Sequence, residues 1–267
     1  MGNRRAYAIH PEIFAAHPNY IRGVVITTRL TNGSSPLEMV SLLREAEDVS
    51  RSQFNLDQRS EHRRFASWRE AYRSFGAKPS KFRPSMEAMI RRILRGDRIP
   101  SIRRLADIGN VGSIRHALPA GGHSTDVMGR DIELRPAHGA ERFIPFGSDL
   151  EEHPEPGEIE FAECDAVLTR RWTWRQATYT LLVEDTTDAL FNVDGLPPVV
   201  HAEVEGSCVE ISELLQEFCG AETRVETLTS AMPCLLLQAI SAPPIRSASR
   251  AASSPRGQPV EVPKRRS

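Results

Sequence analysis

The stretch that decides the fold is Arg104-Leu-Ala-Asp-Ile-Gly-Asn110, followed by Pro119-Ala-Gly-Gly-His-Ser-Thr-Asp126 and by Asp131-Ile-Glu-Leu-Arg135. Apolar residues in Leu105–Ile108 and in the last segment predict short strands, with a glycine-rich loop between them. These segments leave polar side chains at strand ends and in the loop. Such positions are typical of a binding or catalytic site that a rigid scaffold supports.

The pattern of short apolar segments, separated by Gly, Pro, Asn and Asp, continues toward the C-terminus and predicts hairpins and meanders. A helical period returns over residues 210–218, which end at Cys219-Gly220. The further strands are predicted over residues 143–146, 158–162, 166–174, 179–184 and 190–193.

Upstream, residues 22–28 predict one strand, and helical spacing then takes over. Ser35-Pro-Leu-Glu38 is typical of a helix start. Aromatic residues at steps of three and four predict a second helix over 65–75, and a Met-rich stripe predicts a third over 85–96. The chain is therefore predicted to be α+β, with a mostly antiparallel sheet flanked by helices.

The composition is that of a globular chain: 267 residues, of which 40% are apolar and 26% are charged. No apolar run approaches the ~20 residues that span a bilayer. No signal-peptide core follows the N-terminus, so we expect a cytoplasmic protein without membrane contact. The four cysteines lack metal-ligand or redox spacing, and we expect reduced thiols and no metal or other cofactor.

The net charge of −1 does not favour a nucleic-acid binder, but the charge is unevenly distributed. Six arginines oppose a single aspartate within residues 91–104, whereas residues 149–163 hold acidic side chains and no lysine or arginine. After about Pro243 the chain consists mainly of Ser, Ala, Pro and Arg, which predicts a disordered basic tail over 243–267.

The deciding stretch resembles the B3/B4 domain, the editing module of the phenylalanyl-tRNA synthetase beta subunit. That module has an arginine ahead of an Asp-x-Thr-Asn motif, then a Pro-x-His-x-x-Asp loop, then a strand. Here Arg104 stands six residues before Asn110, and His123-x-x-Asp126 is kept. Segments around Phe75-Gly-Ala-Lys-Pro79 and Arg170-Arg-Trp-x-Trp-Arg-Gln176 resemble its freestanding form.

The resemblance covers roughly residues 65–235 and implies hydrolysis of the ester of a mischarged aminoacyl-tRNA. It predicts a B3/B4-like editing domain over 65–242 and a helical extension packed on it over 1–64. No aminoacylation module or ATP signature is present, so we do not expect a tRNA ligase. The implied partner is tRNA, contacted at its aminoacyl end and acceptor stem.

Carried over position by position, the resemblance assigns three groups of candidate residues. The catalytic candidates are His123, Arg104 and Asn110. The candidates for substrate binding are Gly109, Gly122, Asp126 and Gln176. The candidates for tRNA binding are Arg91, Arg92, Arg170, Arg171 and Arg175, and the sequence equally allows the last three to form a solvated strand face.

Ester hydrolysis needs a positioned water, a group that moves its proton, and donors for the developing oxyanion. His123 suits the second task as a neutral base or, as we expect from its glycine-rich loop, holds the terminal nucleotide as an imidazolium. Gly109 replaces the family's threonine, and Gln176 stands near its glutamate. These departures favour an alternative, a tRNA-binding module without hydrolysis. The near-neutral net charge favours a further alternative, a protein that binds a small amino-acid-like molecule.

Overall fold

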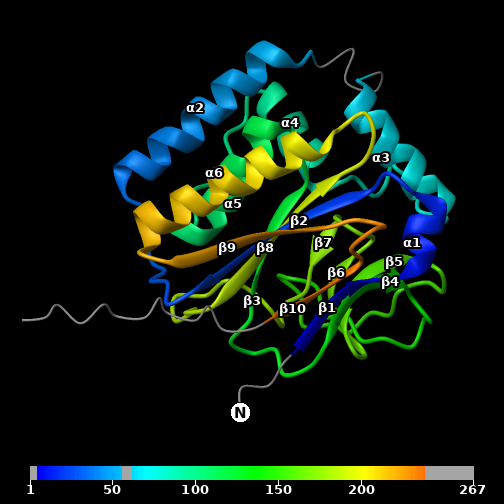
Figure 1. Ribbon diagram of the computed structural model, residues 1–267. Coiled ribbons are helices and arrows are strands. Elements are labelled where there is room, and N and C mark those ends of the chain that lie inside the picture. Colours follow the sequence, from blue (N-terminus) through cyan, green and yellow to red (C-terminus); the bar gives the residue numbers. More distant parts are fainter. Residues whose placement is uncertain (1–4, 56–61, 238–267) are drawn as a thin grey trace, which may run out of the picture.

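The structure is a computed structural model that describes residues 5–55 and 62–237 (Figure 1). It is an α+β fold with two mostly antiparallel sheets, which confirms the predicted fold class. The predicted basic tail over 243–267 lies outside the described residues. Within the described ranges, no helix is both long and apolar enough to cross a bilayer.

The first sheet has four strands in the order β3-β8-β2-β9. Val24 and Ile26 of β2 face one core, whereas Val25 between them faces another. A strand that is covered on both faces needs apolar residues at successive positions, which explains the run over 24–26. The strands are β2 (Ile21–Thr28), β3 (Ala120–Ser124), β8 (Ala189–Gly195) and β9 (Glu222–Leu228).

The second sheet has six strands in the order β10-β1-β4-β5-β6-β7. β1 and β4 pair in parallel, and the other neighbours pair antiparallel. The strands are β1 (Arg5–Ile9), β4 (Ile132–Pro136), β5 (Ile159–Glu163), β6 (Ala166–Arg170), β7 (Arg175–Gln176) and β10 (Cys234–Leu237).

The segment before residue 64, predicted to be a helical extension, supplies one strand to each sheet. β1 lies between β10 and β4, and β2 lies between β8 and β9. The same segment forms α1 (Pro11–Ala16) and α2 (Leu37–Gln53). Residues on both sides of the boundary predicted between 64 and 65 therefore form strands of the two sheets.

The helices cover the sheets in layers (Figure 1). α5 (Arg104–His116) and α6 (His201–Cys219) pack on the outer face of the four-stranded sheet, and α2 packs on α5. α3 (Arg63–Ser74) contributes Trp68 and Tyr72 to the core between the two sheets, as its periodicity predicted. α4 (Ser85–Leu94) begins directly after Pro84, also as predicted.

Some predicted strands are wrong. Residues 105–108 belong to α5, because Leu105, Ile108 and Val111 recur every three residues and all are buried in one core. Residues 143–146 and 179–184 contribute no strand, although isolated bridges occur at 143 and 145. The helix predicted over 210–218 begins already at His201.

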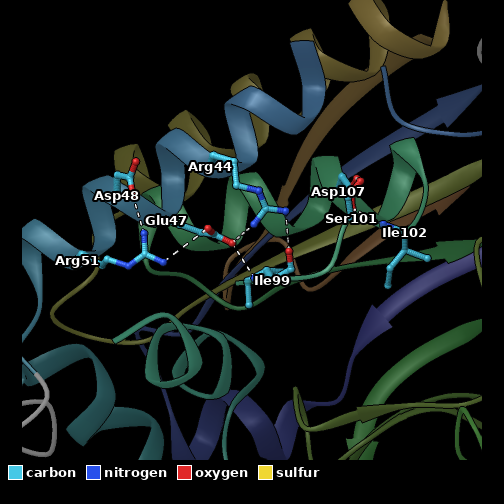
Figure 2. A network of polar contacts seen from close by, with 8 residues as sticks. All are labelled: Arg44, Glu47, Asp48, Arg51, Ile99, Ser101, Ile102 and Asp107. Atoms are coloured by element: carbon cyan, nitrogen blue, oxygen red, sulfur yellow. Dashed lines mark hydrogen bonds and ion pairs between the residues drawn. The ribbon is translucent and has the colours of Figure 1, made fainter. Parts of the chain in front are cut away.

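Two buried carboxylates fix the loop between α4 and α5 (Figure 2). Glu47 of α2 is fully buried and accepts the backbone N–H of Ile99 at 2.7 Å, and Arg44 is bonded to the same carboxylate. Asp107 in the first turn of α5 accepts the N–H of Ile102 at 3.1 Å. A buried carboxylate that accepts backbone donors is a structural element, and Asp107 therefore acts as a cap.

Candidate functional site

A small cavity lies between the two sheets, where β5, β6 and β7 of one sheet face β2, β3 and β8 of the other. Its volume is about 140 Å³. Exposed Gly121 and half-buried Trp174 lie at its outer end, whereas the side chains at its inner end are almost fully buried. The polar side chains that line it are Arg22, Ser85, His123, Thr169, Thr173, Arg175, Gln176, Asn192 and Asp194.

His123 on β3 is held from both sides. Its Nδ1 lies 2.7 Å from Oγ1 of Thr180, and its Nε2 lies 3.2 Å from Oγ1 of Thr169 on β6. Burial, together with the positive charge of Arg22, lowers the pKa of His123 to about 3. The imidazole is therefore neutral near pH 7, which contradicts the expectation that an imidazolium holds the substrate.

Gln176 on β7 closes the cavity beside His123. Its amide nitrogen donates to the carbonyl of Gly122 at 2.9 Å and to that of Thr180 at 3.2 Å. The same nitrogen lies 3.4 Å from Nδ1 of His123. The structure thus brings together two of the predicted residues, His123 and Gln176, with the backbone of a third, Gly122.

A buried ion pair forms the inner end of the cavity, and sequence analysis missed it. Nε of Arg22 donates to Oδ1 of Asp194 at 2.6 Å, and its Nη1 donates to the hydroxyl of Tyr7 at 2.9 Å. The hydroxyls of Tyr7 and Tyr20 donate onward to Asn192 and Asp194. The available signal was an arginine at the start of a strand with no other charged residue, since a buried charge needs a partner.

A strained turn over residues 171–174 supplies the aromatic wall. Arg171 and Trp172 have φ values of 50° and 64°, in the left-handed region that bulky residues avoid. The turn buries Trp172, whose indole N–H donates to Tyr20 at 3.2 Å, and leaves Trp174 half-buried at the cavity. The predicted strand over 166–174 therefore ends at Arg170, and the two tryptophans do not share a strand face.

The structure does not bring Arg104, Gly109 and Asn110 to this cavity. All three lie on α5. Arg104 donates to the carbonyl of Phe218 at 2.8 Å, near the C-terminus of α6. Gly109 faces the ring of Phe191, whose Cε1 would lie 3.4 Å from a Cβ added at this position. The spacing of Arg104 and Asn110 is therefore that of two residues on one helix, whereas the sequence analysis placed them at the ends of a strand.

Asp126 acts as a cap outside the cavity. Its carboxylate accepts the backbone N–H groups of Thr187 at 2.8 Å and Asp188 at 3.0 Å. Asp126 therefore fixes the turn that leads into β8, whereas the resemblance had assigned it to substrate binding.

The arginines predicted to contact tRNA divide into three groups. Arg170 and Arg171 are buried and both pair with Glu158, at 2.7 and 3.1 Å. Arg91 and Arg92 lie in the last turn of α4, away from the cavity lining. Arg175 lines the cavity and donates to the carbonyl of Phe146 at 3.1 Å. Of the five, only Arg175 borders the cavity.

A protein family and a solved structure show similarity to this chain. A sequence model of the B3/4 domain matches residues 67–220. Among solved structures, an N-terminal fragment of the phenylalanyl-tRNA synthetase beta subunit from Pyrococcus horikoshii matches with 12% identity and a TM-score of 0.43. The match covers 82% of this chain but only 50% of that fragment. No curated protein matches the chain.

Proposed function

The chain belongs to the B3/4 domain family, and on this premise we propose that it hydrolyses the ester bond of mischarged aminoacyl-tRNA. The observation that carries the proposal is the cavity between the sheets, with a neutral imidazole in its wall. The family resemblance supplies the substrate class, and the cavity supplies the chemistry.

The size of the cavity limits what enters it. About 140 Å³ equals the volume of roughly five water molecules in the liquid, well below the roughly 300 Å³ at which pockets for drug-sized ligands begin. One amino-acid moiety is therefore the largest group that we expect inside. The ribose and the rest of the nucleotide would remain at the outer end, beside Gly121 and Trp174.

The lining suits an aminoacyl group. Phe161, Trp172 and Trp174 offer apolar surface for a side chain, and Asp194 offers a carboxylate for the α-ammonium group. The neutral His123 would accept a proton from a bound water, whose oxygen attacks the carbonyl carbon. The ester C–O bond then breaks, the ribose oxygen leaves with a proton, and free amino acid and tRNA result.

Backbone donors for the oxyanion stand on the free edge of β3. In an antiparallel pair of strands, every second residue is hydrogen-bonded to the partner strand. Between β3 and β8, the N–H of Thr125 donates to the carbonyl of Asp188, and the N–H of Asp194 donates to the carbonyl of Pro119. This register directs the N–H groups of Ala120 and Gly122 away from β8. They point to the outer edge of β3, where Ala120 lines the cavity and Gln176 bonds the carbonyl of Gly122, and this position suits them to a developing negative charge.

One observation favours a second function, binding of the aminoacyl end without hydrolysis. Both ring nitrogens of His123 already have hydroxyl partners, Thr180 and Thr169. A base whose ring nitrogens are both hydrogen-bonded within the protein can activate a water only if one of these hydrogen bonds breaks. The bond to Thr169 is the longer, so Nε2 is the atom that a water would reach.

A panel of correctly and incorrectly charged tRNAs, with release of labelled amino acid as the readout, tests the proposal. We expect the wild type to hydrolyse at least one mischarged tRNA, and His123→Asn to lose this activity because it removes Nε2. Asn retains a polar atom near the position of Nδ1, which preserves the contact with Thr180. Binding of charged tRNA with no hydrolysis across the panel would select the second function.

A further inference from the structure

The loop between α3 and α4 forms a cleft whose lining is basic and contains no acidic residue. It has a volume of about 650 Å³. Arg73 and Lys78 are exposed, and no described residue forms an ion pair with either one or with Arg83. The lining residues are Arg69, Arg73, Gly76, Ala77, Lys78, Pro79, Ser80 and Arg83.

The cleft has a fixed floor. Arg69 of α3 makes a two-pronged contact with Glu87 of α4, whose carboxylate is fully buried, and so ties the two helices together. Gly76, at a φ of 83°, turns the chain out of α3, and the N–H of Ala77 bonds the carbonyl of Tyr72 at 2.9 Å. The three remaining cations are Arg73 in the last turn of α3 and Lys78 and Arg83 in the ordered loop that follows.

The cleft and the His123 cavity lie close together. Arg83 lines the cleft and Ser85 lines the cavity, so their Cα atoms lie within about 7 Å. Half-buried Phe82, next to Arg83 in the chain, packs on Trp174 of the cavity lining with ring centroids 4.8 Å apart. A nucleic-acid strand that runs from the cleft to the cavity would therefore contact the cations first and the aromatic rings next.

Proteins bind single-stranded nucleic acid with a positively charged groove along its phosphate backbone and with nearby aromatic side chains on which the bases stack. We infer that this cleft, lined by Arg73, Lys78 and Arg83, binds the phosphates of the single-stranded 3′ end of an RNA whose terminus enters the His123 cavity. The inference rests on the proposed function for the identity of that RNA. It differs from the sequence prediction, which placed the contact at residues 91–92 and 170–175.

The test is binding of uncharged tRNA by fluorescence anisotropy, which needs no hydrolysis. Arg73→Gln/Lys78→Gln should weaken binding about tenfold at 0.1 M salt and lower the salt slope by about 1.4, because each phosphate contact to a single strand contributes about 0.7. Arg95→Gln/Arg98→Gln removes the same charge at the opposite end of α4 and should change binding less than twofold. A tRNA without its single-stranded 3′ end should bind the wild type and the cleft variant equally.

Equal weakening by the two double variants would show diffuse attraction and overturn the inference, as would a cleft variant that binds intact tRNA normally. A difference that persists on the shortened tRNA would overturn the assignment to the single strand. Absence of deacylation, with binding that still depends on the cleft, would remove the proposed hydrolysis and leave this inference standing.

Discussion

Nε2 of His123 lies 3.2 Å from Oγ1 of Thr169 and thereby joins the two sheets across the cavity. His123 is on the edge strand β3 of one sheet, and Thr169 is on β6 of the other. A contact between two sheets is set by their packing, so the reactive nitrogen is positioned by the whole fold rather than by its own loop. Thr169 is also the residue that a water must displace or join.

His123→Asn should therefore slow deacylation about 100-fold or more, the scale of losing an acid–base group. Thr169→Val keeps the shape of the wall and frees Nε2, so we expect a smaller loss or a gain. Single-turnover release of labelled amino acid measures both variants. If His123→Asn retains the wild-type rate, the imidazole has no role in the chemistry.

Arg104→Ala should leave the deacylation rate unchanged and lower stability by about 1 to 2 kcal/mol. The guanidinium donates to Phe218 in the last turn of α6, where a cation also interacts favourably with the helix dipole. Urea unfolding measures the loss, and the rate is measured where the variant is fully folded. If Arg104→Ala lowered the deacylation rate without lowering stability, Arg104 would have a catalytic role after all.

The family resemblance pointed to His123 and Gln176 through short local motifs. Sequence patterns could not predict the ion pair at the inner end of the cavity, since Arg22 and Asp194 are 172 positions apart and meet only through sheet pairing. The motif that contains Arg104 and Asn110 was assigned to a strand, although Leu105, Ile108 and Val111 have helical spacing. Tertiary packing, which sequence patterns do not encode directly, separates these two residues from the cavity.

The pH dependence of the rate should show no inflection near pH 6.5. Burial and the charge of Arg22 lower the pKa of His123 to about 3, so the base stays neutral between pH 5 and 8. Measurements of kcat/KM on a mischarged tRNA over that range check this. An inflection that His123→Gln removes would show that the imidazole titrates near neutrality.

Stability should depend on the same group at acid pH. Between pH 6.5 and about 3, the unfolded chain binds a proton at His123 that the folded chain excludes. The contribution of neutral His123 to the free energy of unfolding is therefore complete above pH 6.5, and it is lost as the pH falls toward 3. The difference in urea midpoint between wild type and His123→Gln, followed against pH, isolates it from the carboxylates.

Asp194→Asn should destabilise the fold by about 3 kcal/mol or more, because it leaves the buried guanidinium of Arg22 without its counter-charge. Asp185→Asn is the matched control: this aspartate is exposed, and we expect a change within about 0.5 kcal/mol. Urea unfolding at pH 7 compares the two. Equal stability would mean that the ion pair does not hold the inner end of the cavity together.

The two glycines of β3 provide the last test, because neighbouring positions differ in the space around them. A methyl group at Gly122 would lie 2.7 Å from both Leu182 Cδ1 and Phe191 Cε1, whereas one at Gly121 would meet nothing within 4 Å. Gly122→Ala should therefore cost about 1 to 3 kcal/mol, the range for overpacking, and Gly121→Ala should be close to neutral. If Gly122→Ala still folds below its melting temperature but loses deacylation, the displaced edge of β3 explains the loss, since its N–H groups are the proposed oxyanion donors. Normal deacylation by a destabilised Gly122→Ala would instead remove that edge from the mechanism.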